Sequence, residues 1–235
     1  TSTGNPFGAS VSFNLPTGTV ADDVTVFIGA FAGATVAGSV TIPAGWTTIF
    51  NANGTFAFYR KFVVADPSSI TLTSSDTANS WSYAAVSKIG CDTTTPVDVF
   101  NNNILLANAQ ATLNAPSVAP TFTNDLLLAC YSAIVGLSGT WTTPAGFASV
   151  IAATGGPTCL IAQKQLSSAA QTGSVASTAP HTNQPISGVQ IALHAAGDTT
   201  STQAAPIMTL GGTLRNSGGA SSFTPAISKI GPQVN

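Results

Sequence analysis

Residues 21–31 read ADDVTVFIGAF, and residues 123–133 read TNDLLLACYSA. Each stretch opens with a polar pair that ends in an aspartate, Asp23 or Asp125, and continues as an apolar run. Short apolar runs that are rich in β-branched or aromatic residues and bounded by turn residues are typical of β-strands. A strand entrance that occurs twice in one chain predicts repeated structure.

The same order of motifs follows each of these strands. The first is followed by Pro43-Ala44-Gly45-Trp46, then by a Gly-containing turn at 51–55, a Lys-containing strand at 56–62, a Ser/Thr-rich strand at 70–75 and a closing strand at 81–89. The second is followed by Pro144-Ala145-Gly146-Phe147, then by 153–157, 159–166, 173–178 and 186–194 in the same roles. The repeated Pro-Ala-Gly-aromatic motif is interpreted as a turn in which Gly takes a positive φ and the ring packs on the edge of the core.

These patterns predict an all-β fold with two tandem, duplicated antiparallel β-sandwich domains of jelly-roll-like type. We place the first copy at 1–100, a linker at 101–107 and the second copy at 108–196. Residues 197–235 have no counterpart in the first copy and are rich in Gly, Ser, Thr and Pro, yet they contain the apolar clusters PIMTL and AISKI. We expect an extended C-terminal arm that orders on a partner. Its expected anchoring residues are Pro206, Ile207, Met208, Leu210, Leu214, Phe223, Ile227 and Ile230.

The composition is unusual in its lack of charge. Charged residues make up 6% of the chain, against about 25% in ordinary soluble domains, while the 44% of hydrophobic residues is enough to build cores. A neutral, hydroxyl-rich surface lacks the repulsion that keeps small proteins apart and suits a chain packed among neighbours. Six Lys and Arg without a basic patch argue against nucleic-acid binding. No apolar run approaches the roughly 20 residues of a membrane span, and no signal peptide is expected at the N-terminus.

Residue types that carry chemistry are scarce. Cys91, Cys130 and Cys159 are expected as buried thiols, and His181 and His194 as surface or strand-end histidines. Asp23 and Asp125 are expected to make side-chain hydrogen bonds at the two strand entrances. A calcium site at Asp22 and Asp23 is the weaker alternative, because calcium takes six to eight oxygen ligands and nearby carboxylates are scarce. We therefore predict no catalytic residue, no metal site and no cofactor.

Four segments carry a family resemblance: DDVTVFIGAF (22–31), IPAGWTTIF (42–50), FAFYRKFV (56–63) and ITLTSSDTANSWSYAAVSKIGCDTTTPVDV (70–99). Together they resemble β-sandwich domains of bacteriophage virion proteins, through Gly90, Asp92, Pro96 and Asp98. The second copy matches less well, because Phe147 replaces the tryptophan and the Gly-x-Asp ending is lost. The resemblance implies a virion structural component, either a capsid decoration (cement) protein or a tail or fibre module, and implies no catalytic residues.

From this resemblance and the missing chemistry we expect a non-enzymatic cement protein on the capsid surface, made in the host cytoplasm. Its expected partners are the major capsid protein or other virion proteins and copies of itself. The alternative is a tail, fibre or other carbohydrate-binding adhesin module. That alternative requires exposed aromatic rings that stack on sugars, and the candidates are Trp46, Trp81 and Trp141.

Overall fold

The computed structural model describes residues 1–4, 8–32, 38–64, 66–75, 80–105, 112–134, 139–154, 156–179 and 185–197. Over these residues the only regular elements are β-strands, and every named strand pair is antiparallel. The prediction of an all-β fold is therefore confirmed. Residues 1–201 form one compact unit.

Four sheets make up this unit, and we name them by their place in it. The first inner sheet has the order β1 (Ser2–Gly4), β8 (Ser80–Lys88), β3 (Val24–Ala32), β6 (Thr55–Lys61), β5 (Thr47–Ala52). The first outer sheet has the order β2 (Ser10–Asn14), β7 (Ser69–Ser74), β4 (Val40–Thr41). The second inner sheet has the order β12 (Ala148–Ala153), β13 (Thr158–Gln165), β11 (Leu126–Ala133), β15 (Ile186–Leu193), β9 (Val97–Leu105). The second outer sheet pairs β10 (Thr112–Ala115) with β14 (Val175–Thr178).

The strand order of the two inner sheets corresponds position by position. The first inner sheet has the order β1, β8, β3, β6, β5, and the second, read from its other edge, has the order β9, β15, β11, β13, β12. In the outer sheets, β2 and β7 correspond to β10 and β14. This matching order is what a duplicated chain would show. The duplication itself remains a prediction. Residues 101–105, which we expected in the linker, lie in β9 and pair with β15.

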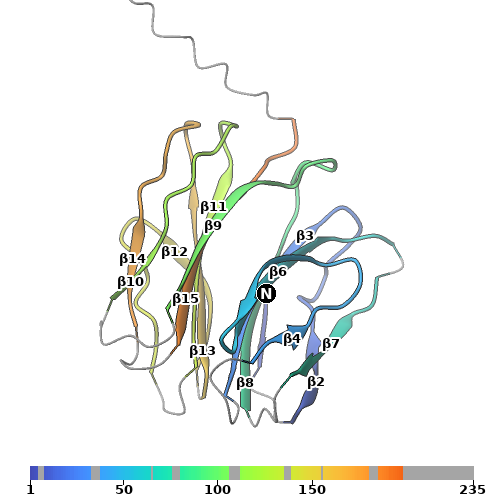
Figure 1. The fold of residues 1–235 in the computed structure, drawn as a ribbon. Helices are drawn as coiled ribbons and strands as arrows, with labels where there is room; N and C mark the ends of the chain where they lie inside the picture. The colour runs from blue at the N-terminus through green and yellow to red at the C-terminus, as the bar shows by residue number, and fades with distance from the viewer. Residues whose placement is uncertain are drawn as a thin grey trace, which may run out of the picture. The chain divides into compact units, whose positions relative to one another are not determined.

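The two inner sheets pack face to face and share one hydrophobic core (Figure 1). Val26 and Ile28 of β3 lie in this shared core together with Cys130 of β11 and Ile161 of β13. At the sheet edges, β1 lies by β12 and β5 lies by β9. Each inner sheet is thus covered on both faces, by the other inner sheet on one side and by its own outer sheet on the other.

This double coverage explains the unbroken apolar strands. Because side chains alternate between the faces of a strand, Val26 and Ile28 of β3 face the shared core while Phe27 and Phe31 face the first outer sheet. A strand buried on both faces reads as a continuous apolar run rather than as an alternating one. The apolar run at 24–31 is therefore a central strand of a multilayer fold.

The Pro-Ala-Gly-aromatic motif forms a turn in both halves, as predicted. The Trp46 amide donates to the Pro43 carbonyl at 3.3 Å, and the Phe147 amide donates to the Pro144 carbonyl at 3.1 Å. Gly45 and Gly146 have φ values of 83° and 77°, as the third residue of such a turn requires. The rings of Trp46 and Phe147 are half-buried against the cores beneath them.

Replacing Gly45 by alanine should lower the free energy of unfolding by about 1–2 kcal/mol, because a residue with a Cβ pays this cost at positive φ. The added Cβ would also stand 2.5 Å from Arg60 Nη1, so that the Arg60 side chain must move. Gly146→Ala is the matched control, since an added Cβ there meets no atom within 4 Å. Urea denaturation should show a loss in both variants and the larger loss in Gly45→Ala; an undiminished stability in both would contradict the turn.

Candidate interaction surface

The loops at one end of the inner sheets form the candidate surface. Val24, the first residue of β3, pairs with Lys88, the last residue of β8. Lys88 lines a hollow of about 260 Å³ together with Leu126 at the start of β11 and Leu193 at the end of β15. Strands β3 and β11 therefore begin at the same end of the unit. We call this the loop end.

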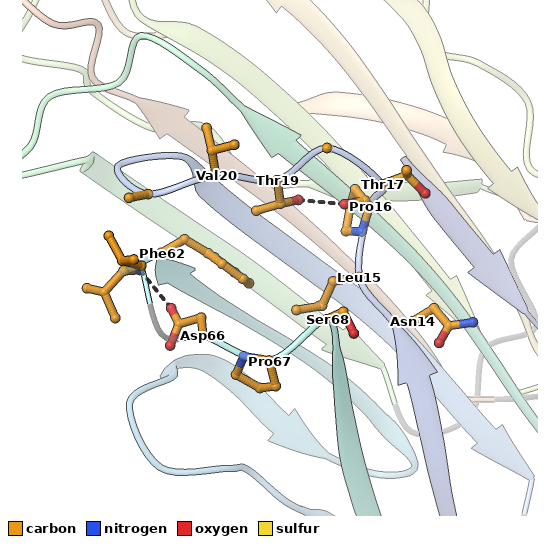
Figure 2. Close-up of a pocket in the computed structure, with 14 residues that line it drawn as sticks. Asn14, Leu15, Pro16, Thr17, Thr19, Val20, Phe62, Asp66, Pro67 and Ser68 are labelled. Atoms are coloured by element: carbon orange, nitrogen blue, oxygen red, sulfur yellow. Dashed lines mark hydrogen bonds between the residues drawn. The ribbon is translucent and has the colours of Figure 1, made fainter.

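A hollow of about 440 Å³ lies at the loop end of the first half (Figure 2). Its lining comes from two places in the chain: residues 14–21, at the end of β2 and before β3, and residues 62–64 and 66–68, between β6 and β7. We call it the valine hollow. Leu15 and Phe62 are buried, whereas Val20, Val63 and Val64 are 59%, 53% and 94% exposed. The hollow thus presents apolar side chains to its surroundings in a chain that has little charge.

A bidentate ion pair braces the 62–68 segment. The Arg60 guanidinium donates to both carboxylate oxygens of Asp66, with Nε at 3.0 Å from Oδ2, and it also donates to the Ala44 carbonyl at 3.0 Å. The Val63 amide donates to Asp66 Oδ2 at 2.8 Å (Figure 2). The Asp66 side chain is only 5% exposed. The brace therefore ties the segment to the Pro-Ala-Gly-Trp turn and fixes the loop that carries Val63 and Val64.

The other segment of the hollow is fixed by local hydrogen bonds. Thr19 Oγ1 donates to the Pro16 carbonyl at 2.7 Å (Figure 2). The Val20 amide donates to the buried carboxylate of Asp23 at 3.0 Å, which confirms the role predicted for Asp23. Asp22 has a φ of 71° and its carboxylate pairs with Lys61 Nζ at 3.0 Å. Within the described residues no group of three or more His, Cys, Asp or Glu is placed to hold a metal ion.

A second hollow of about 200 Å³ occupies the corresponding place in the second half. It is lined mainly by residues 164–172, which connect β13 to β14 as residues 62–68 connect β6 to β7. Ser167 and Ser168 follow β13 as Val63 and Val64 follow β6, and they make this part of the lining polar. Apolar residues also line this hollow: Leu127, Phe147, Leu166, Ala170 and Val175. The large exposed apolar side chains Val20, Val63 and Val64 lie at the hollow of the first half.

The third hollow, at the junction of the two halves, brings together Lys88, Cys91 and His194. His194 is buried, which corrects the expectation of a surface position and confirms the strand-end one. Its ring stacks on Phe122 with centroids 3.6 Å apart, and its Nδ1 lies 3.3 Å from the Thr95 carbonyl oxygen. His181 lies outside the described residues.

Two charged side chains near this junction, Asp92 and Lys88, have shifted pKa values. The amides of Thr95 and Thr94 donate to Asp92 and hold the pKa of its carboxyl below the usual range. Burial lowers the pKa of the Lys88 ammonium, which donates to Gln163 of the second half. The hydrogen bond between Lys88 and Gln163 therefore links β8 to β13 across the shared core.

Cys91, Cys130 and Cys159 are buried free thiols, as predicted. Burial raises the pKa of Cys91 from 9.0 to about 11, with Asp23 and Asp125 adding to the rise and Lys88 opposing it. Burial also raises the pKa of Cys130 and Cys159. Because the thiolate is the nucleophilic form, these environments disfavour a nucleophilic role.

Cys91 should react slowly with iodoacetamide in the folded protein. A pKa raised from 9.0 to about 11 leaves about 100-fold less thiolate at pH 8. As the pH rises, the unfolded chain loses the thiol proton first, so the stability that this group contributes is present below about pH 9 and is lost as the pH rises through about 11. Mass spectrometry of labelled peptides, with and without urea, measures the difference. Equally fast labelling of Cys91 in both states at pH 8 would contradict this environment.

The structure corrects part of the sugar-binding expectation. Trp81 is 0% exposed and Trp141 is 5% exposed, so the expectation of exposed rings is wrong for these two residues. Their indoles fill the cores between inner and outer sheets. Trp46 is half-buried, and its ring packs edge-on against Phe27, Phe58 and Phe62. All eight arm residues predicted as anchors, from Pro206 to Ile230, lie outside the described residues.

The valine hollow was missed in the sequence. The Lys-containing strand was expected at 56–62 with no turn marked directly after it, and β6 ends at Lys61. Beyond it, the Phe62 amide donates to the Asp23 carbonyl at 2.8 Å, and the Val63 amide is held by Asp66. The usable signal was the Asp66-Pro67 pair, because Asp and Pro favour turns and the turn leaves the preceding valines outside the strand.

Comparison with known proteins found no match for this chain among protein-family models, curated proteins or solved structures. In the part of the chain that the structure describes, no helix is long and apolar enough to cross a membrane.

Proposed function

We propose that the chain is a non-enzymatic structural protein of a bacteriophage virion, and specifically a capsid decoration protein. In this role it is made in the host cytoplasm and binds on the capsid surface. It contacts the major capsid protein and copies of itself through its sheet surfaces and through residues 197–235. No cofactor takes part.

The observation that carries this proposal is the exposed apolar lining of the valine hollow. Val20, Val63 and Val64 gather at one hollow and are each more than half exposed. Large apolar side chains that are exposed beside one hollow suit a contact with another molecule, and the low charge of the whole chain removes the repulsion that would oppose such contact. An assembly protein needs this combination of features.

Two further features support the proposal. The segments at 22–31, 42–50, 56–63 and 70–99 resemble virion β-sandwich domains. The first three lie in or beside sheets of the first half, and the fourth begins in β7 and ends at 97–99 in β9 of the second inner sheet. The shared core also suits a structural role, because a unit in which both halves stabilise the same interior resists partial opening.

Co-sedimentation with candidate undecorated phage capsids tests the proposal. The full-length chain should bind at a fixed ratio to the capsid subunits, and a full-length variant carrying Ile207→Ser, Met208→Ser and Leu210→Ser should bind at least tenfold more weakly. Thr209→Ser and Thr213→Ser together form the matched control, which should bind like the unchanged chain. A chain that sediments with phage tails and not with capsids would overturn the decoration role, and a chain that binds neither would overturn the virion assignment.

A further inference from the structure

We propose that the valine hollow of one copy receives the C-terminal segment, residues 198–235, of a second copy. This inference rests on the proposed function, and it names the receiving site for the self-association that a decoration protein uses. The acceptor is built from residues 14–21, 62–64 and 66–68. The donor is identified from its sequence.

The last described residues, 195–197, lie at the loop end of the unit. The Ala196 amide donates to the Gly90 carbonyl at 2.8 Å, and the backbones of Cys91 and Ala195 form an isolated antiparallel β-bridge. Residue 197 therefore lies beside the 89–96 segment at the loop end. The same segment is tied to the first half by Lys61 Nζ, which donates to the Thr93 carbonyl at 2.7 Å. The chain therefore leaves the described unit at the end that carries the valine hollow. The remaining residues could span on the order of 100 Å if extended, which is enough to reach a neighbouring copy.

The apolar clusters of the C-terminal segment match the apolar lining of the valine hollow in chemistry. The segment carries apolar residues in two clusters, PIMTL at 206–210 and AISKI at 226–230, separated by Gly, Ser and Thr. Such clusters supply the anchors that a chain needs when it orders on binding. The hollow offers Leu15 and Phe62 as buried apolar surface and the three valines as exposed apolar surface. Asn14, Thr17 and Ser68 stand around it as polar groups that can hydrogen-bond the backbone of a bound peptide (Figure 2).

The numbers of donor segments and of acceptor hollows in each copy also match. Among the described residues only the first half has exposed valines at its hollow, because Ser167 and Ser168 follow β13 where Val63 and Val64 follow β6. Each chain thus carries one donor segment and one apolar acceptor. A donor and an acceptor at different places on the same chain make a head-to-tail contact, which closes into a ring when the rotation between copies permits. A symmetric cluster of copies follows from this pairing.

Photo-crosslinking of the full-length chain tests the site. A benzophenone-bearing amino acid replaces Val64, which is 94% exposed and should tolerate the change, and equal amounts of ¹⁴N- and ¹⁵N-labelled chains are mixed before irradiation. We expect crosslinks from position 64 to residues 198–235, with about half of them joining chains of different isotope. The control places the same amino acid at Ile89, which is 80% exposed and outside the hollow lining. Because Ile89 lies beside the point where its own chain leaves the described unit, the control should give at least tenfold fewer crosslinks between chains of different isotope. Crosslinks within one isotope only, or none to residues 198–235, would overturn the proposal.

Sedimentation equilibrium gives an independent measurement. Val63→Asp with Val64→Asp should weaken self-association at least tenfold, whereas Ile89→Asp should leave it unchanged. An unchanged association constant in the valine variant would overturn the acceptor assignment. Failure of the site and failure of the proposed function remain distinguishable. If position 64 does not crosslink while capsids still bind the chain, only the docking site falls; if copies crosslink but capsids do not bind, only the virion role falls.

Discussion

Replacing Trp81 by alanine should lower the free energy of unfolding by about 3–5 kcal/mol, as expected for a fully buried tryptophan. Trp81 lies on β8 and is 0% exposed. Its ring packs against Phe13 of the first outer sheet and Phe31 of the first inner sheet, with centroids 5.7 and 5.0 Å away. Its Nε1 donates to the Gly8 carbonyl at 2.6 Å, and truncation would leave that carbonyl without this donor. Because whole domains are stable by only about 5–15 kcal/mol, this loss is a large fraction of the total.

Chemical denaturation followed by far-UV circular dichroism measures the effect. Trp81→Phe keeps a ring and should lose less than Trp81→Ala. Trp46→Ala at the half-buried turn should also lose less, because less of that side chain is removed from solvent. A Trp81→Ala variant that keeps full stability but loses binding to a sugar would contradict the buried position and restore the adhesin alternative.

Replacing Ile28 by alanine should destabilise both halves of residues 1–201 together. Ile28 is 0% exposed and lies in the core that the two inner sheets share, and truncating such a residue costs about 2–5 kcal/mol. Because Leu128, Cys130 and Ile161 of the second half belong to the same core, the loss should not remain in the first half. Hydrogen-exchange mass spectrometry should show equal loss of protection in the slowest amides of β3 and of β11.

Ile89→Ala is the control for this experiment. Ile89 is exposed, and surface substitutions of this kind usually change stability by less than about 0.5 kcal/mol. If Ile28→Ala weakened protection in β3, β6 and β8 but left β11, β13 and β15 unchanged, the two halves would be independent domains, and the shared core would not couple them.

Much of the fold could be predicted from the sequence because strand patterns and turn residues act locally. The entrance at Asp23 and the Gly45 and Gly146 turns follow from short-range rules of conformation, and the buried thiols follow from the general tendency of free cysteine to be buried. The packing of the two inner sheets on each other could not be predicted in this way. It depends on both faces of β3 and β11 being covered, and apolar runs such as 24–31 do not say which surface covers each face.

The candidate site was harder to predict for a similar reason. Val63 and Val64 continue the apolar run of β6 in the sequence, and only the hydrogen bonds of Asp66 and Phe62 end the strand before them. The tryptophans were candidates for exposed rings only under the adhesin alternative, because an aromatic residue beside Asn or Asp suits both a sugar site and a core edge. Burial decides between these interpretations, and burial is a property of the packed sheets.

Electron cryomicroscopy of undecorated phage capsids incubated with the full-length chain tests the decoration role most directly. The account predicts added density at symmetry-related positions on the outer capsid surface, with residues 1–197 fitted into it and their loop ends facing neighbouring copies or the shell. Capsids without added density under conditions in which the chain is folded and in excess, or density confined to the tails, would contradict it.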